Sequence, residues 1–382
     1  MIKEDLISFI VYILMLAVAA IVGFAIISPA FKGVSTIGYG WNVVGYLIVC
    51  LIIAIIIEVI FFEIAHAIGA KIGKYKILSI NVLGFSFNKH LDEKSGKYKV
   101  KFKFPSNFDG LTGETLIAPT SEKSNPMYYT FAPLFLFAIE AALLVVFYMV
   151  ITKPKTGQNP LDFVKYFQLI IVTVGGMLFI YDYTPAKLDS VTDGYRLVLL
   201  NKKINVRAYN VLLNIRADEF LGNSSEKYET FTEITDFTSE VNIASVRNFL
   251  KKDHHEEALE LVNQIIDSKT TLSFETRTVA KIYKLNIILY YKTSEEAKAF
   301  YESFNEKETE YLKSNYTMLT IRTAILYYGI VEKSNSECEN QIHQVKKALE
   351  KESAYSKKYE EDLLRKTIVV LKEKNNEIEA TY

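Results

Sequence analysis

Long apolar runs dominate the first half of the chain. Residues 6–27 form an apolar run without a charged side chain, and further runs cover residues 41–72, 127–151 and 163–181. Each is close to or above the roughly 20 residues that an α-helix needs to cross a bilayer. The pattern predicts four transmembrane helices in a membrane domain of residues 1–200. A cleaved signal peptide is the alternative for the first run, which is longer than the apolar core of such a peptide.

Between the second and third runs the pattern changes to a period of two. Residues 75–82 and 97–104 alternate apolar and polar side chains, and the turn-rich residues 92–96 separate them. A period of two is typical of a half-buried strand. We therefore expect a β-hairpin at the membrane surface within residues 75–104. The many lysines of this segment indicate that it lies on the cytoplasmic side of the membrane, so both termini are expected in the cytoplasm. The membrane is expected to be a bacterial plasma membrane.

The second half of the chain is more polar and shows helical periodicity. Residues 201–230 form a basic amphipathic linker that is expected to lie on anionic lipid, with the membrane as its partner. Residues 231–382 predict a cytoplasmic helical domain, including one long helix over 306–331. The motifs Glu256-Glu257-Ala258-Leu259 and Glu295-Glu296-Ala297-Lys298 lie 39 residues apart, a spacing similar to tetratricopeptide repeats. A general helical bundle is the alternative, and the overall fold class is mainly α.

Charge and cysteine content narrow the class of partner. Lys and Arg together number 44, and so do Asp and Glu, so the balanced charge gives no indication of a nucleic-acid partner. The two cysteines, Cys50 and Cys338, lie in segments of different character. Neither a disulfide framework nor a cysteine metal site is indicated.

The second apolar run contains the first candidate chemistry. Glu63 and His66 are three residues apart and share one face of the predicted helix. An ionisable pair at membrane depth is a functional-site hypothesis by default. In the zinc-protease motif His-Glu-x-x-His, two imidazoles bind the metal and the Glu activates a water molecule. Here Phe62 occupies the position of the first His.

A second polar segment follows the fourth apolar run. It contains Asp182-Tyr183-Thr184-Pro185 and then Asp193-Gly194. Taken alone, it reads as an interfacial turn with a helix cap at Thr192 or Asp193. Taken together with Glu63 and His66, it offers an aspartate as a further zinc ligand.

In this order the motifs resemble the site-2 protease family of intramembrane zinc metalloproteases, over residues 51–200. Phe131-Ala132-Pro133-Leu134 is similar to the Gly-Pro-Leu of that family, and the segment after the fourth run is similar to its Asn-x-x-Pro and Asp-Gly motifs. The resemblance implies that Glu63 is the catalytic carboxylate and that His66 and Asp193 are zinc ligands. The remaining motif positions that it implies are Phe62, Pro133, Asp182, Pro185 and Gly194.

The chain departs from the family at the metal. A catalytic zinc ion has three protein ligands, and the motif supplies only His66 and Asp193. Glu58, one turn before Phe62, is a possible substitute ligand, and a structural carboxylate is its alternative. Three functions are therefore open. The preferred one is a catalytically degraded scaffold that binds membrane-protein helices and cytoplasmic partners. The others are an active zinc protease that cleaves a transmembrane substrate, and a membrane-anchored helical adaptor that binds a cytoplasmic protein or peptide.

Overall fold

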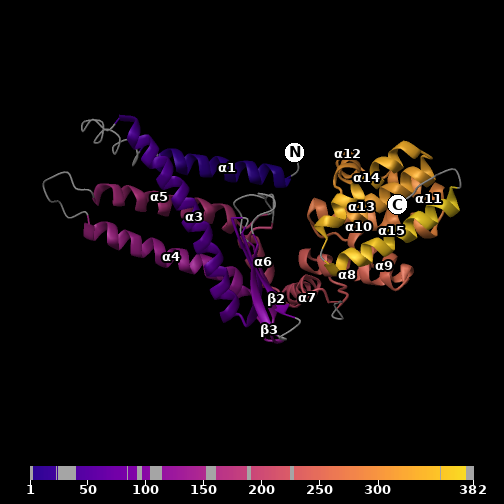
Figure 1. The fold of residues 1–382 in the computed structure, drawn as a ribbon, viewed down its shortest axis with the longest axis horizontal. Helices are drawn as coiled ribbons and strands as arrows, with labels where there is room; N and C mark the ends of the chain where they lie inside the picture. Colours follow the sequence, from indigo (N-terminus) through magenta and orange to yellow (C-terminus); the bar gives the residue numbers. More distant parts are fainter. Residues whose placement is uncertain are drawn as a thin grey trace. The chain divides into compact units, whose positions relative to one another are not determined.

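The computed structural model divides into two compact units, Met1–Val206 and Arg207–Tyr382, and most of the chain is α-helical (Figure 1). The structure describes residues 3–22, 24, 40–83, 85–92, 97–103, 114–151, 161–186, 191–223, 228–352 and 354–375.

Four apolar helices form most of the first unit, namely α1 (Lys3–Val22), α3 (Gly40–Ile72), α4 (Pro126–Ile151) and α5 (Leu161–Tyr183). Within the described residues, two stretches are long and apolar enough to cross a membrane, Gly45–Ile72 and Pro126–Phe147. They correspond to the second and third predicted spans. The apolar stretches of α1 and α5 are shorter, so the first and fourth spans stay predictions.

The crossing of α3 and α4 is close because small residues meet there. A Cβ atom built on Gly69 would lie 2.4 Å from the Tyr128 carbonyl oxygen and 2.6 Å from the Cβ of Ala132. Small residues let the backbones of apolar helices approach one another. This approach brings Tyr129 of α4 against the turn of α3 that carries His66.

A four-stranded antiparallel sheet packs beside α3, and its strands are β1 (Tyr75–Val82), β2 (Phe85–Asp92), β3 (Lys97–Lys103) and β4 (Glu114–Pro119). The strand order is β3-β2-β1-β4. The predicted β-structure is confirmed, but the predicted hairpin is wrong in its pairing. β2 lies between the two predicted strands and pairs with both. Leu83, in the turn before β2, has a φ of +52°. Leucine rarely adopts this conformation, so the sequence gave no sign of a turn there.

A short helix, α6 (Asp193–Leu200), follows α5. The side chain of Thr192 accepts a hydrogen bond from the backbone N–H of Tyr195, so Thr192 is the N-cap, one of the two residues predicted for that position. A Cβ atom on Gly194 would lie 2.2 Å from the carbonyl oxygen of Tyr183. Glycine at this position lets α6 begin directly against the end of α5.

The second unit is helical, as predicted. Its elements, together with α7, which spans the boundary between the units, are α7 (Lys203–Phe220), α8 (Asp236–Lys251), α9 (His255–Ile266), α10 (Phe274–Tyr291), α11 (Ser294–Tyr301), α12 (Glu306–Ser314), α13 (Met318–Leu326), η2 (Tyr327–Val331), α14 (Asn335–Lys351) and α15 (Ala354–Lys374). The single helix predicted over 306–331 is wrong, because Thr317 caps a new helix within it. The tetratricopeptide character of the bundle stays a prediction.

Helix α7 lies within the basic segment, residues 201–230, that was predicted to lie on lipid. Leu212, Leu213 and Ile215 of this helix are buried inside the protein. Arg207 and Arg216 form ion pairs with Glu229 and Glu240. These apolar side chains are therefore packed against protein instead of facing a lipid surface.

Candidate functional site

His66 lies at the centre of a buried polar network. Its Nδ1 atom is 3.2 Å from the backbone oxygen of Tyr129, and its ring packs on the Tyr129 ring with centroids 4.6 Å apart. Its Nε2 atom is 3.2 Å from Oδ2 of Asp193. A carbonyl oxygen can only accept a hydrogen bond, so Nδ1 carries a proton in this arrangement and Nε2 is turned toward Asp193.

Asp193 joins α6 to the helix bundle. Its carboxylate is buried, and Oδ1 accepts a hydrogen bond of 2.8 Å from the Arg196 guanidinium one turn later. Its backbone N–H donates to Oδ1 of Asp182 at 3.4 Å. Oδ2 accepts no hydrogen bond from the described residues, although Nε2 of His66 lies beside it. The structure therefore brings together three of the residues singled out in the sequence.

Glu63 is buried on the adjacent face of α3 and is held by the sheet. Its Oε2 atom accepts a hydrogen bond of 2.5 Å from the Thr115 hydroxyl of β4. The Tyr129 hydroxyl in turn donates to the backbone oxygen of Thr115 at 3.3 Å. Tyr129 thus contacts His66 directly and reaches Glu63 through Thr115.

Phe62 points to the same side of α3 as His66. The two rings meet edge to face with centroids 5.2 Å apart, and Phe62 also contacts the Tyr183 ring at 6.3 Å. The position that would hold the first zinc histidine is therefore filled by an aromatic ring. That ring packs against the network and has no atom that could bind a metal ion.

The other candidate residues lie around this network. Pro133 is inside α4, one turn after Tyr129. Pro185 is exposed in the turn that ends α5. Glu58 is buried against α5, where a Cβ atom on Gly175 would lie 2.7 Å from its carboxylate. Its Oε1 atom has no hydrogen-bond partner among the described residues.

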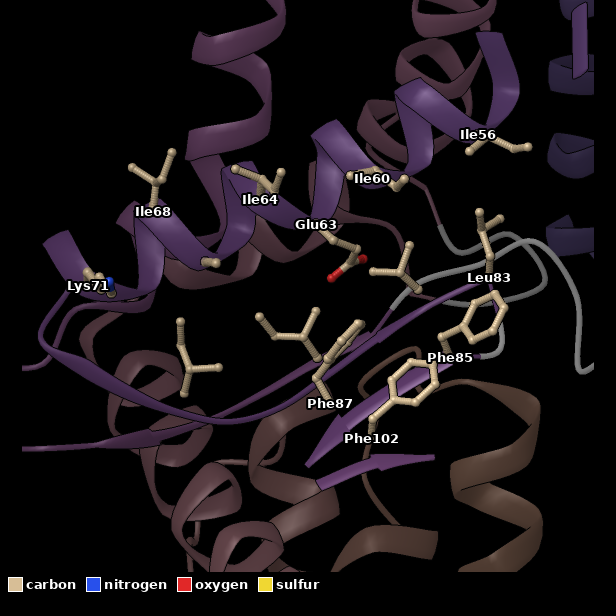
Figure 2. Close-up of a pocket in the computed structure, with 14 residues that line it drawn as sticks. Ile56, Ile60, Glu63, Ile64, Ile68, Lys71, Leu83, Phe85, Phe87 and Phe102 are labelled. Atoms are coloured by element: carbon tan, nitrogen blue, oxygen red, sulfur yellow. The ribbon is translucent and has the colours of Figure 1, made fainter. Parts of the chain in front are cut away.

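A groove of about 900 Å³ runs between α3 and the sheet (Figure 2). The side chain of Glu63 points from α3 into this groove, toward the phenylalanines of β2 and β3. Apart from Glu63 and Lys71, all the lining residues are apolar. The groove is lined by Ile56, Ile60, Glu63, Ile64, Ala67, Ile68, Lys71, Ile77, Ile80, Val82, Leu83, Phe85, Phe87 and Phe102. Neither His66 nor Asp193 is among these described lining residues, so the groove meets the network only at Glu63.

The residues of the network do not fit a catalytic zinc ion. His66 Nε2 and the orphaned Oδ2 of Asp193 are two converging donors, whereas a catalytic zinc site has three. The other Asp193 oxygen is occupied by Arg196. Across the described residues, no group of three His, Cys, Asp or Glu side chains is placed to hold a metal ion.

Sequence reasoning missed four residues of this network. Three are joined to it by tertiary contacts, and Arg196 pairs with Asp193 three residues earlier on the same helix. Thr115 is far from α3 in the sequence, so its contact with Glu63 was not predicted. The residue types of Tyr183 and Arg196 alone gave no indication of a role. Only Tyr129 carried a signal, because a proline four residues later leaves its carbonyl without a helical donor. The missed residues are Thr115, Tyr129, Tyr183 and Arg196.

No family model, curated protein or solved structure matches this chain.

Proposed function

We propose that this chain is an integral membrane protein of site-2-protease-like architecture that binds an apolar membrane segment of another protein and does not cleave it. The observation that carries the proposal is the groove between α3 and the sheet. It lies along a helix that is long and apolar enough to cross a membrane. Its partner would be the transmembrane segment of a second membrane protein.

The chemistry of the lining supports an apolar occupant. Phe85 and Phe87 of β2 and Phe102 of β3 are each more than a third exposed, and their rings contact one another. Apolar side chains gathered on one face are typical of an interaction surface. Lys71, in the last turn of α3, is the cation of this lining and favours an acidic or carbonyl group at the nearby end of the bound segment.

The network behind the groove supports binding without cleavage. A zinc protease activates a metal-bound water next to the scissile bond. Here a segment in the groove meets Glu63, whereas His66 and Asp193 are not among the residues that line the groove. One oxygen of the Asp193 carboxylate is bound by Arg196, and Nε2 of His66 lies 3.2 Å from the other, so protein groups occupy the surroundings of this carboxylate. The resemblance to site-2 proteases is retained in this proposal as a shared architecture, with Glu63, His66 and Asp193 as structural groups.

Photocrosslinking in the native membrane tests the occupant. A photoreactive phenylalanine analogue at Phe87 or Phe102 is expected to form adducts whose crosslinked peptides map to the transmembrane segment of one protein. The matched control is the same analogue at Lys101, which is exposed and points to the opposite face of β3 from Phe102. The same adducts should disappear when Ile64, on the helical wall of the groove, is replaced by Arg. Adducts with lipid alone, or equal adducts from Lys101, would contradict the proposal.

Two further measurements separate the scaffold from its alternatives. Zinc content of the purified protein is expected to stay far below one ion per chain after incubation with metal. The crosslinked partner is expected to be intact, whereas a protease would leave it cleaved in a manner that depends on Glu63. An adaptor that acts only through its helical domain would show no dependence on Ile64 at all.

A further inference from the structure

Glu58 is a buried carboxyl near the middle of the apolar stretch Gly45–Ile72 of α3, and it is only 3 % exposed. Its Oε2 atom would lie 2.7 Å from a Cβ atom on Gly175, so the glycine of α5 leaves the space that this carboxyl fills. Its Oε1 atom has no hydrogen-bond partner among the described residues. Burying a polar group without a partner is costly. The unpaired oxygen therefore indicates a ligand that this part of the chain does not supply.

Glu140 of α4 is a second carboxyl of the same kind. Its Oε2 atom is also buried without a partner in the described part of the chain. It is close enough to Glu58 for the two negative charges to repel each other. Glu140 is half-buried, and it shares a face of α4 with the exposed apolar side chains of Leu143 and Phe147. The two carboxyls thus form one acidic site, and its outer member lies beside the exposed apolar face of α4.

The chemistry of this acidic site favours an organic cation. Across the helices and strands that the structure describes, no third His, Cys, Asp or Glu joins the two carboxyls in a group that could hold a metal ion. An ammonium group has three hydrogen-bond donors and a guanidinium group has five, so one lysine or arginine side chain can reach both carboxyls. Ionisable residues at membrane depth are almost always paired with one another or with backbone carbonyls. The apolar surroundings of Glu140 favour a cation that is carried by a helix over one that arrives from water.

We propose that Glu58 and Glu140 bind the lysine or arginine side chain of a transmembrane helix of another protein, which packs on the outer face of α4. Glu140 meets the cation at the helix surface, and Glu58 accepts from it on the inner side. Neither residue lines the groove between α3 and the sheet. The inference is therefore independent of the function proposed for the groove.

A synthetic transmembrane helix of leucine and alanine with one central lysine is the probe. The peptide carries a donor fluorophore, the full-length protein carries an acceptor, and both are reconstituted in phosphatidylcholine vesicles. Energy transfer then measures their association. The lysine helix is expected to bind about tenfold more tightly than the same helix with leucine at the central position, the size of one or two polar contacts between helices in a membrane.

Conservative variants assign this preference to the two carboxyls. Glu58→Gln and Glu140→Gln keep the size of the side chain and remove its charge, so each is expected to abolish the preference for the lysine helix. Gln168→Leu in α5 is the matched control. Gln168 is also buried with an unpaired side-chain oxygen among the described residues, but it carries no charge, so the preference should persist. Photocrosslinks from Phe87 are expected to be unchanged in both glutamine variants, which separates this site from the groove.

Each outcome decides the proposal. Equal binding of the lysine and leucine helices to the parent protein overturns it, because the carboxyls then need no external cation. A preference that persists in both glutamine variants also overturns it, because the lysine then binds elsewhere. If Glu58→Gln does not elute as a folded protein in size-exclusion chromatography, the half-buried Glu140 provides the same comparison. A preference that is lost in the glutamine variants and kept in Gln168→Leu supports the proposal.

Discussion

The ring of Phe62 meets the ring of His66 edge to face, with the centroids 5.2 Å apart. In the zinc-protease motif the residue at this position is a histidine that provides a metal ligand. The phenylalanine ring here packs against His66 and has no nitrogen that could bind a metal. Among the described residues, the donor atoms that converge next to it are Nε2 of His66 and Oδ2 of Asp193.

Phe62→His is expected to create a zinc site. The new imidazole would lie next to His66 and Asp193 and complete a set of three ligands. Zinc measured by mass spectrometry on the desalted protein is expected to rise from well below one ion to about one ion per chain. The double variant Phe62→His with Asp193→Asn should lose the bound metal. Stoichiometric zinc in the parent protein would instead show that Phe62 does not limit binding.

Gly194→Ala is expected to destabilise the first unit. Its new methyl group would lie 2.2 Å from the carbonyl oxygen of Tyr183, and a backbone atom cannot rotate away. Overpacking of this kind costs about 1–3 kcal/mol of the free energy of unfolding. The expected result is a lower thermal unfolding midpoint in detergent, followed by circular dichroism.

The matched control for this substitution is Gly176→Ala in α5. A Cβ atom at Gly176 has no described neighbour within 4 Å, and alanine favours a helix over glycine by about 1 kcal/mol. The unfolding midpoint of this variant should equal or exceed that of the parent. An equal loss of stability in both variants would contradict a specific contact at Gly194.

The parts of the fold that were predicted correctly are those that depend on residues close together in the sequence. The length of the second apolar run and the period-two segments locate α3 and the sheet, because each pattern is set by the burial of its own residues. Thr192 signals the start of α6 because a threonine oxygen can accept from the first free amides of a helix. The residues Glu63, His66 and Asp193 could be selected because polar groups in apolar surroundings are costly.

The partners of those residues could not be predicted, because they are set by tertiary contacts. Thr115 reaches Glu63 only when β4 pairs with β1, and the sequence prediction contained no β4. Tyr129 reaches His66 only through the close crossing at Gly69. Arg196 differs from these two, because it is a local partner that lies three residues after Asp193 on α6 and pairs with its carboxylate.

Arg322→Met is expected to destabilise the second unit strongly. Arg322 is buried and pairs with Glu360 through two contacts of 3.0 and 3.2 Å. Removing one member leaves a buried charge with less compensation, which costs about 3–5 kcal/mol. The control is Arg365→Met, because Arg365 is exposed and lies 3.8 Å from an equally exposed Asp362. That pair should contribute at most about 1 kcal/mol. Urea unfolding followed by circular dichroism compares the two, and equal midpoints would contradict the argument.

Cys338 is expected to be almost inert toward alkylating reagents in the folded protein. Burial, together with the carboxylates of Glu337 and Glu339, raises the pKa of the Cys338 thiol to about 11. Its sulfur also donates a hydrogen bond to the Ile325 carbonyl at 3.3 Å. Only the thiolate is nucleophilic, so the fraction that reacts is small at pH 8 and increases as the pH rises toward the raised pKa.

Intact-mass measurement after treatment with iodoacetamide checks this expectation in a Cys50→Ala background. The control places the thiol two residues earlier on the same helix, as Ser336→Cys with Cys338→Ser, because Ser336 is exposed. Alkylation at 336 should be at least about a hundredfold faster at pH 8, since an exposed thiol keeps an ordinary pKa and is accessible. In urea, Cys338 should react at the same rate as the control thiol. Equal rates in the folded proteins would mean that α14 does not bury this side chain.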